Sequence, residues 1–239
     1  MARRDVARRA GGVSIHRAMN ALLTTLLCGL AGYLVGSIPF GWIIVKVLKG
    51  VDVRQVGSGR TGGTNVFRAA GPVAGIATAI LDVLKGVVAV LLVRQLVVGT
   101  SGWAEALTGF GVVLGHNASC FLNFRGGAGG ATAVGTSIAL WPWGGLPAFV
   151  LGSLMLFVGG YASIASILAG LTVALANTIG AVLNVTQWSY AAYGWGVLGL
   201  ILIALRPNIA RLRAGTEQRV SWFKRNSAQV RSSSSATAQ

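Results

Sequence analysis

Acidic side chains are scarce in this sequence. Its 239 residues contain only 5 Asp and Glu against 20 Lys and Arg, and charged residues make up 10% of the chain. Soluble domains are about one quarter charged, so this balance excludes an ordinary soluble fold. So few carboxylates also fail to support a metal site with several carboxylate ligands or a chain of proton-relay groups. The sequence therefore predicts no metal and no other cofactor.

Cysteine is almost absent as well. Cys28 and Cys120 lie in or beside apolar segments, and their spacing is not that of a metal site. We assign neither a disulfide nor a metal to them. Packing against apolar side chains is the expected role of both.

Apolar residues and glycine are abundant instead. Hydrophobic residues make up 54% of the chain, which has 35 glycines, and the mean hydropathy is +0.69. Small residues let helices approach closely in lipid, so this composition predicts an integral membrane protein. The net charge of +15 comes from basic residues between and after the apolar runs. Anionic lipid headgroups and phosphate ligands are therefore expected as partners, and nucleic acid is not.

The apolar runs predict a single all-α bundle of seven transmembrane helices, at about 20 residues per crossing. The first runs from about 21 to 47 with a break near Pro39, the second from 73 to 93, and the third from 103 to 124. Residues 131–205 contain four more, of which we expect the first two to be short. Breaks at 142–147, 161–166 and 184–189 separate these four.

The second predicted helix carries two ionisable residues. Asp82 and Lys85 are three positions apart and therefore share one helical face. Ionisable groups at this depth usually pair or line a functional site. We favour an internal ion pair that orients the helix over a direct catalytic role.

A glycine-rich loop, residues 56–68 (VGSGRTGGTNVFR), follows the first helix. Four glycines that can adopt positive φ, four neutral donors and two arginines predict a phosphate cradle. They are Gly57, Gly59, Gly62 and Gly63, then Ser58, Thr61, Thr64 and Asn65, and finally Arg60 and Arg68. A nucleotide-binding P-loop is rejected, because Gly63 stands where that motif needs lysine and no strand precedes it. Alone, such a loop would more often be a flexible connector.

A second glycine-rich loop makes the anion site more plausible than a connector. It lies within residues 115–132 (GHNASCFLNFRGGAGGAT), where glycines that include Gly126, Gly127 and Gly129 surround Arg125. Two helices separate the loops, so both are expected on the same side of the membrane. His116 is expected at the membrane edge, where a lone histidine is as often structural as catalytic.

The tail after the last helix is basic. Residues 206–226 can form an amphipathic segment with Arg211 and Arg213 near headgroups, and the serine-rich end from 227 is expected to be disordered. We divide the chain into a basic extension (residues 1–18), a membrane domain (19–217) and this basic, then serine-rich tail (218–239).

The positive-inside rule orients the bundle. Both glycine loops and the tail carry basic residues. Leaving out the N-terminus, the opposite side of the predicted bundle holds only Arg94. The loops and the C-terminus are therefore expected in the cytoplasm. The arginines of the extension oppose this, since seven crossings place residue 1 outside. Either the other helices overrule them or translation begins at Met19, which we favour; peptides from residues 1–18 in the mature protein would exclude that start.

Five blocks of the sequence together resemble one family. They are GSIPFG (36–41), GSGRTGGTN (57–65) with Arg68, GHN with FRGGAGGAT (115–117 and 124–132), YASIAS (161–166) and NIARLRAGTE (208–217). In order and over nearly all of residues 19–217, they resemble the bacterial acyl-phosphate:glycerol-3-phosphate acyltransferases of the inner membrane. The resemblance implies seven helices, a cytoplasmic active site, and acyl transfer from acyl phosphate to the 1-hydroxyl of glycerol 3-phosphate. Acyl-CoA and acyl carrier protein are not direct donors in this family.

The resemblance also implies roles for residues. It places Ser58 and Arg68 in an essential block, Asn208 in the active site, Glu217 as a structural anchor, and the second loop at glycerol 3-phosphate. With the residue chemistry, the predicted catalytic set is Ser58, Arg68, Asn208 and His116. The predicted phosphate-binding set is Gly57, Gly59, Arg60, Thr64, Asn65, Arg125, Gly126, Gly127, Gly129 and Ser163. A mixed anhydride has a good leaving group, so orientation and electrostatic stabilisation can replace a strong nucleophile.

Several positions depart from the family pattern. Arg60 stands where asparagine is usual, Ala128 where lysine is usual, Gly160 where arginine is common, and Leu205 where histidine is usual. Leucine cannot act as a base, so the hydroxyl proton goes to a substrate phosphate or to His116, or this member is impaired. We expect Arg60 to offset the missing cation at Ala128.

Two other functions remain open. The first is a transporter or binding protein for phosphate esters or lipids, and the second is a degenerate, non-catalytic paralogue. Inverted repeats with discontinuous helices would favour a transporter, but the sequence has no evident repeat of this kind. The expected partners are acyl phosphate, glycerol 3-phosphate and membrane lipids, without an obligate protein partner.

Overall fold

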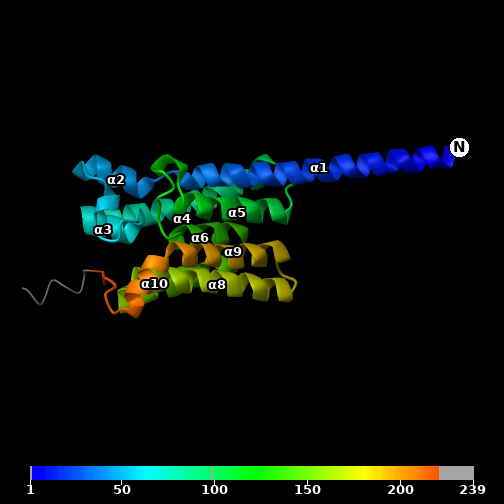
Figure 1. Cartoon of the computed structure of the whole chain (residues 1–239). Helices are drawn as coiled ribbons and strands as arrows, with labels where there is room; N and C mark the ends of the chain where they lie inside the picture. Colours follow the sequence, from blue (N-terminus) through cyan, green and yellow to red (C-terminus); the bar gives the residue numbers. More distant parts are fainter. Residues whose placement is uncertain (1, 98, 221–239) are drawn as a thin grey trace, which may run out of the picture.

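The computed structural model describes residues 2–97 and 99–220, with side chains described from residue 16 onward. In these ranges the chain forms helices and no strand. The bundle consists of α1 (Ala2–Ser37), α4 (Pro72–Leu96), α5 (Gly102–Asn117), α6 (Gly130–Leu140), α7 (Pro142–Gly159), α8 (Ala162–Val182) and α9 (Trp188–Ala204). The shorter helices α2 (Phe40–Lys49), α3 (Gly63–Ala70) and α10 (Arg206–Arg213) lie together at one end of it (Figure 1).

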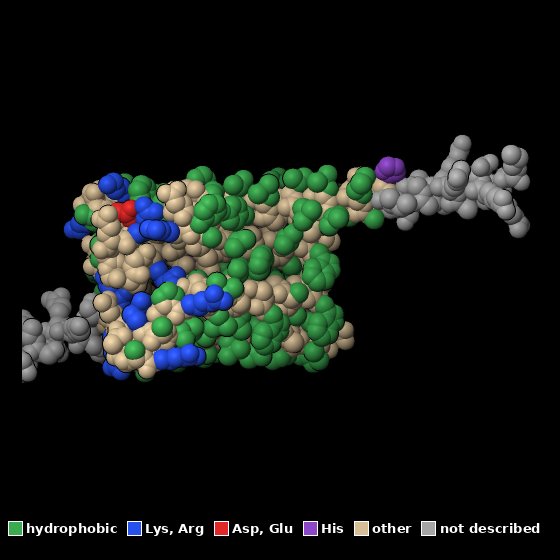
Figure 2. Space-filling view, viewed as in Figure 1, with side chains coloured by type: hydrophobic (Ala, Val, Ile, Leu, Met, Phe, Trp, Pro, Cys, Tyr) green, Lys and Arg blue, Asp and Glu red, His purple; other side chains and the backbone are tan. Residues whose placement is uncertain are grey.

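Four segments are long and apolar enough to cross a membrane. They are His16–Lys49, Pro72–Leu96, Pro142–Gly159 and Ala162–Val182. A fifth results if α9 and α10, which meet at 63°, count as one bent span. Hydrophobic side chains cover the flank of the bundle, whereas Lys and Arg gather at the end with α2, α3 and α10 (Figure 2). The prediction of an all-helical membrane protein is confirmed.

Two of the predicted helix boundaries are wrong. The third helix was expected to reach residue 124, but α5 ends at Asn117. A short 3-10 turn follows, and Asn123 and Phe124 have φ values of 53° and 59°, which an α-helix cannot contain. Of the four helices in 131–205 only α6 is short, because α7 has 18 residues and continues through Pro147.

The break near Pro39 is confirmed, since α1 ends at Ser37 and α2 begins at Phe40. A break inside a membrane leaves backbone carbonyls that water cannot reach, and protein groups must bond them. The Ser119 hydroxyl donates to the Ser37 carbonyl at 2.6 Å. The Lys85 ammonium donates to the Ile38 carbonyl at 3.3 Å. Groups from outside α1 and α2 therefore stabilise the break.

Glycines bring α1 and α5 into direct backbone contact. A Cβ added to any of four glycines would overlap a backbone oxygen of the opposite helix, so no larger residue fits. These positions are Gly32 and Gly36 on α1, and Gly111 and Gly115 on α5. This contact sets the position of α5 along α1, and so brings the end of α5 beside the break in the first span.

Replacing Gly111 should therefore destabilise the bundle. Gly111→Leu forces α1 away from α5, and we expect a loss of about 1–3 kcal/mol in the free energy of unfolding. Thermal unfolding in detergent measures this loss. Gly199→Ala on α9 is the matched control, because a Cβ there meets nothing within 4 Å. Equal stabilities of the two variants would contradict the glycine interface.

Candidate functional site

The first glycine loop is shorter than predicted. It covers residues 56–62, because α3 begins at Gly63 and carries Thr64, Asn65 and Arg68 as helical residues. Positive φ occurs at Gly57 (52°) and Gly59 (72°) but not at Gly62, which is extended, or at Gly63. The loop thus leads directly into a helix N-terminus, whose first N–H groups lack partners within the helix.

Asn65 has a different role from the predicted one. Its side-chain amide donates to the carbonyls of Val53, Val56 and Arg60 at 2.8–3.0 Å, and its oxygen accepts the Ser58 N–H at 3.0 Å. The residue is only 2% exposed. Because these bonds use both donors and the acceptor of the amide, Asn65 does not offer a hydrogen bond to phosphate. It holds the loop in shape.

The second loop folds back on the end of α5. The Gly127 N–H donates to the His116 carbonyl at 2.9 Å. A Cβ on Gly126 would overlap the same carbonyl, so a larger residue does not fit there. Gly129, with φ of 89°, forms the N-cap of α6. The unpaired first N–H groups of α6 and its dipole then favour an anion at the end of this loop.

The two loops are in contact, in agreement with the prediction that they share one side of the bundle. Arg54 donates through Nη1 to the Leu122 carbonyl at 3.0 Å, and Arg60 donates through Nη1 to the Gly127 carbonyl at 3.3 Å. Arg54 is itself held by the Asp52 carboxylate at 2.6 Å. Hydrogen bonding to Arg54 lowers the pKa of Asp52 to about 2, so this attachment is charged at neutral pH.

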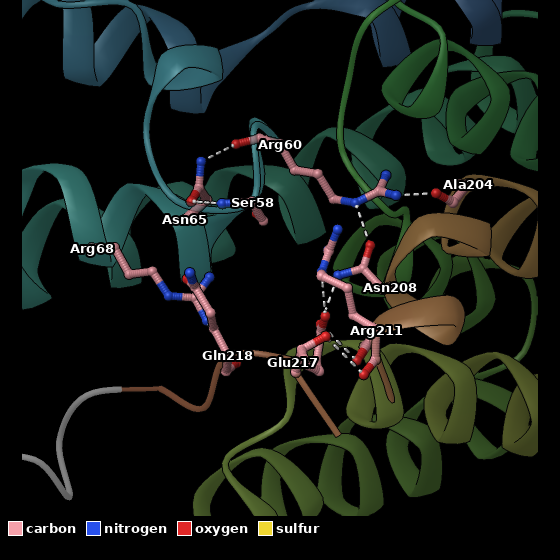
Figure 3. A network of polar contacts seen from close by, with 11 residues as sticks. Ser58, Arg60, Asn65, Arg68, Ala204, Asn208, Arg211, Glu217 and Gln218 are labelled. Atoms are coloured by element: carbon pink, nitrogen blue, oxygen red, sulfur yellow. Dashed lines mark hydrogen bonds and ion pairs between the residues drawn. The ribbon is translucent and has the colours of Figure 1, made fainter. Parts of the chain in front are cut away.

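Arg60 extends from the first loop to the start of α10 (Figure 3). Its Nε donates to Asn208 Oδ1 at 3.2 Å, and its Nη2 donates to the Ala204 carbonyl. The same guanidinium bonds Gly127, directly beside Ala128. It therefore places a positive charge at the second loop, where the compensation hypothesis expects one.

Glu217 connects the parts of the chain around α10. Its carboxylate accepts from Asn208 Nδ2 at 2.7 Å, from Arg211 Nε at 2.8 Å and from the Ser163 hydroxyl at 3.1 Å. Arg68 reaches the next residue and donates to the Gln218 carbonyl at 3.2 Å (Figure 3). These contacts connect Glu217 to α8 and α10, and its role as a structural anchor stays a prediction.

The site carries excess positive charge. Burial lowers the pKa of Arg60 and of Arg68; the charge of Arg211 also lowers both, and that of Glu217 raises both. All three guanidiniums nevertheless remain protonated, because arginine does not lose its proton in proteins. Three cations thus share one carboxylate, and a bound anion would relieve their repulsion.

Besides Asn65, two more of the predicted site residues do not behave as expected. The Arg125 side chain is exposed and makes no hydrogen bond or ion pair within the described ranges, although its backbone N–H donates to the Leu122 carbonyl at 3.2 Å. His116 is not a lone histidine at an edge, because it is 6% exposed and lies against Asp82 and Lys85. The expected Asp82–Lys85 ion pair is present, with an N–O distance of 2.9 Å.

Sequence reasoning missed Arg211 as a member of the site, and Arg54 as the link between the loops. Arg211 was assigned to headgroups, although its spacing of three residues from Asn208 puts both on one face of a helix. That spacing was an available signal. Nothing in the local sequence indicates the bond from Arg54 to a backbone carbonyl 68 residues away.

The unusual residues at 160 and 205 have structural explanations. Gly160 ends α7 with φ of 74°, a conformation that favours glycine over arginine. The Arg219 guanidinium lies 5.0 Å from the centre of the neighbouring Tyr161 ring. Leu205 is 2% exposed and belongs to the main hydrophobic cluster. Its side chain contributes to packing in this chain.

Fold and site together define an integral membrane protein with a cluster of arginines and two glycine-rich loops at one end of its helical bundle. Residues 26–215 match the family described as glycerol-3-phosphate acyltransferase. The chain belongs to this family. Two bacterial proteins with this name are among its relatives. The Desulforudis audaxviator protein is 43% identical over 86% of this chain and 100% of its own. The Deinococcus radiodurans protein, glycerol-3-phosphate acyltransferase 1, is 41% identical over 83% and 96%.

Two crystal structures of PlsY (YgiH), an integral membrane glycerol 3-phosphate acyltransferase, are similar to this fold. The glycerol 3-phosphate form has a TM-score of 0.71 and 36% identity, covering 84% of this chain and 95% of that one. The lysophosphatidic acid form has a TM-score of 0.69 and 35% identity, covering 82% and 94%.

Removing the Asn65 side chain should loosen the first loop. Asn65→Ala leaves three backbone carbonyls and one N–H without their partner, and we expect a loss of about 2 kcal/mol in the free energy of unfolding. Thermal unfolding in detergent and proteolysis of residues 53–62 measure the effect. Gln55→Ala, an exposed change in the same segment, should leave both unchanged. Equal protease resistance in the two variants would refute this role of Asn65.

Proposed function

We propose that this protein transfers a fatty acyl group from acyl phosphate to the 1-hydroxyl of glycerol 3-phosphate, giving lysophosphatidic acid and inorganic phosphate for phospholipid synthesis. The observation that carries the proposal is the group of three guanidiniums around one carboxylate, beside two glycine loops in contact. Related structures have glycerol 3-phosphate and lysophosphatidic acid forms, which supports the acceptor and the product.

The chemistry of the donor suits this site. The 1-hydroxyl oxygen forms a bond to the acyl carbon as the bond from that carbon to the phosphate oxygen breaks. Phosphate leaves with the electron pair, and the hydroxyl proton ends on a phosphate oxygen. Positive charge stabilises the leaving phosphate, and fixed positions for both substrates lower the entropic cost. Leu205 offers no base, so a substrate phosphate is the proton acceptor in this proposal.

The proposed division of the site follows the contacts. Ser58 and Arg68 act on the reacting groups, and Asn208 orients Arg60 at the second loop. Gly126, Gly127 and Gly129 with the start of α6 hold the phosphate of the acceptor. Thr64, at the N-terminus of α3, faces the other phosphate with Gly57 and Gly59. Ser163 and Glu217 keep α8 and α10 in register.

The orientation in the membrane is also a proposal. We propose seven crossings, the first by α1 with α2 and the others by α4, α5, α6, α7, α8 and α9. The positive-inside rule then favours the cytoplasm of a bacterial inner membrane for the basic end seen in Figure 2. We expect the C-terminus on that side as well. Residues 1–18 are an extension before Met19, and most of the tail assigned to 218–239 lies outside the described residues.

An activity assay tests the reaction. Purified protein given acyl phosphate and labelled glycerol 3-phosphate should form lysophosphatidic acid, whereas acyl-CoA should not replace the donor. Ser58→Ala and Arg68→Ala should each lower kcat/KM by about 100-fold or more, as loss of a transition-state donor does. Arg213→Ala, an exposed arginine on α10, is the control. Binding or transport without product would favour the transporter, and neither binding nor product would favour the paralogue.

Arg60 should set the affinity for glycerol 3-phosphate. Arg60→Ala removes the charge beside Ala128, and we expect the KM for glycerol 3-phosphate to rise roughly tenfold or more, as for a lost hydrogen bond to a charged group. Arg60→Lys keeps the charge without the fork geometry and should recover part of the loss. An unchanged KM in Arg60→Ala would reject the compensation hypothesis.

A further inference from the structure

A buried polar cluster lies beside the phosphate site and has no part in the reaction described above. It consists of Asp82 and Lys85 on α4 and His116 on α5, which are 2%, 5% and 6% exposed. Lys85 Nζ lies 2.9 Å from Asp82 Oδ1 and 2.8 Å from His116 Nδ1. It also donates to the Ile38 carbonyl at 3.3 Å. The three protons of the ammonium group therefore have three acceptors.

These contacts fix the form of the imidazole. An ammonium group has donors only, so His116 Nδ1 accepts from Lys85 at 2.8 Å, a shorter contact than the 3.4 Å from Nδ1 to Asp82 Oδ1. In a neutral imidazole with an accepting Nδ1, the proton is on Nε2. Asp82 supplies the paired anion that a buried ammonium group needs. Because Nδ1 already accepts from Lys85, it cannot accept a proton from a substrate hydroxyl.

The Nε2 side of the ring faces the second glycine loop. A Cβ placed on Gly127 would overlap Nε2 and would lie 2.7 Å from Cε1 and 3.0 Å from Cδ2 of the same ring. The backbone of His116 also accepts the Gly127 N–H at 2.9 Å. The Gly127 carbonyl accepts from Arg60 at 3.3 Å. His116 and Arg60 thus both contact Gly127.

We propose that Asp82 and Lys85 are positioning residues that hold His116 with its proton on Nε2, so that His116 supports the phosphate loop as a hydrogen-bond donor and takes no proton from the acceptor hydroxyl. The inference rests on the proposed function, because it assigns this loop to the phosphate of glycerol 3-phosphate. It replaces the predicted role of His116 as a possible base.

The position of the proton can be measured without turnover. The chain has two histidines, so His16→Gln leaves His116 as the single one. In that protein, labelled with ¹⁵N-histidine and held in detergent, NMR should find a protonated Nε2 and an unprotonated Nδ1. Glycerol 3-phosphate should shift the Nε2 signal. A proton on Nδ1 with a free Nε2 would overturn the inference, whether or not the protein transfers acyl groups.

Kinetics separate the donor from a base. The glutamine amide nitrogen can take the place of Nε2, whereas that of asparagine is too short to reach it. His116→Gln should therefore keep a KM for glycerol 3-phosphate within about threefold of the original, and His116→Asn should raise it roughly tenfold, as for one lost hydrogen bond to a charged group. A general base would instead lower kcat by about 10²–10⁴ in both variants, which would overturn the inference.

Lys85→Met tests the positioning role. It should raise the KM for glycerol 3-phosphate roughly tenfold with little change in kcat, the pattern of lost binding in both ground state and transition state. Arg94→Met is the matched control, because it removes the cation from another buried carboxylate, Glu105 at 2.6 Å. The control should lower stability but leave KM unchanged. A KM that rises equally in both variants would overturn the specific role of Lys85.

Discussion

One buried ammonium group joins the parts of this protein that must be aligned. Lys85 bonds the open carbonyl at the break of the first span, its own helix neighbour Asp82, and His116 at the end of α5. In an apolar environment each of these groups would be costly if it were alone. Because one cation satisfies all three, the break, α4 and α5 have a fixed relative position, and the glycine loops that follow α2 and α5 meet at the same end of the bundle.

At that end of the bundle, in contrast, the charged groups are not all paired. Within the described part of the chain, Arg60, Arg68 and Arg211 share a single carboxylate, that of Glu217, so their repulsion is incompletely cancelled. The bundle tolerates this because glycine contacts and core packing hold the helices independently of the site. A protein can retain such local repulsion where an anionic ligand removes it. The contacts that stabilise the fold are therefore concentrated within the bundle, and the charges that repel one another lie at its end.

Much of this arrangement could be predicted from the sequence. Long apolar runs and Pro39 gave the helices and the break, and counting crossings placed both loops on one side. Local pattern failed where tertiary contacts decide. Gly63 reads as loop, but its place against α4 makes it the first residue of a helix. Asn65 reads as a ligand donor, but its four bonds depend on how residues 53–60 fold around it. The burial of His116 depends on a lysine 31 positions away.

Several hydrogen bonds of the arginines go to backbone carbonyls, which affects how freely the sequence around them can change. Arg60 and Arg68 donate to carbonyl oxygens of Ala204, Gly127 and Gln218. Every amino acid supplies the same oxygen, so the side chains at 204 and 218 can drift over generations without removing an acceptor. Only Gly127 is restricted, and for lack of space. Selection can thus maintain this end of the protein by keeping a few cations, the side chains of Asn208 and Glu217 that bond two of them, and the path of the main chain, while much of the surrounding sequence diverges.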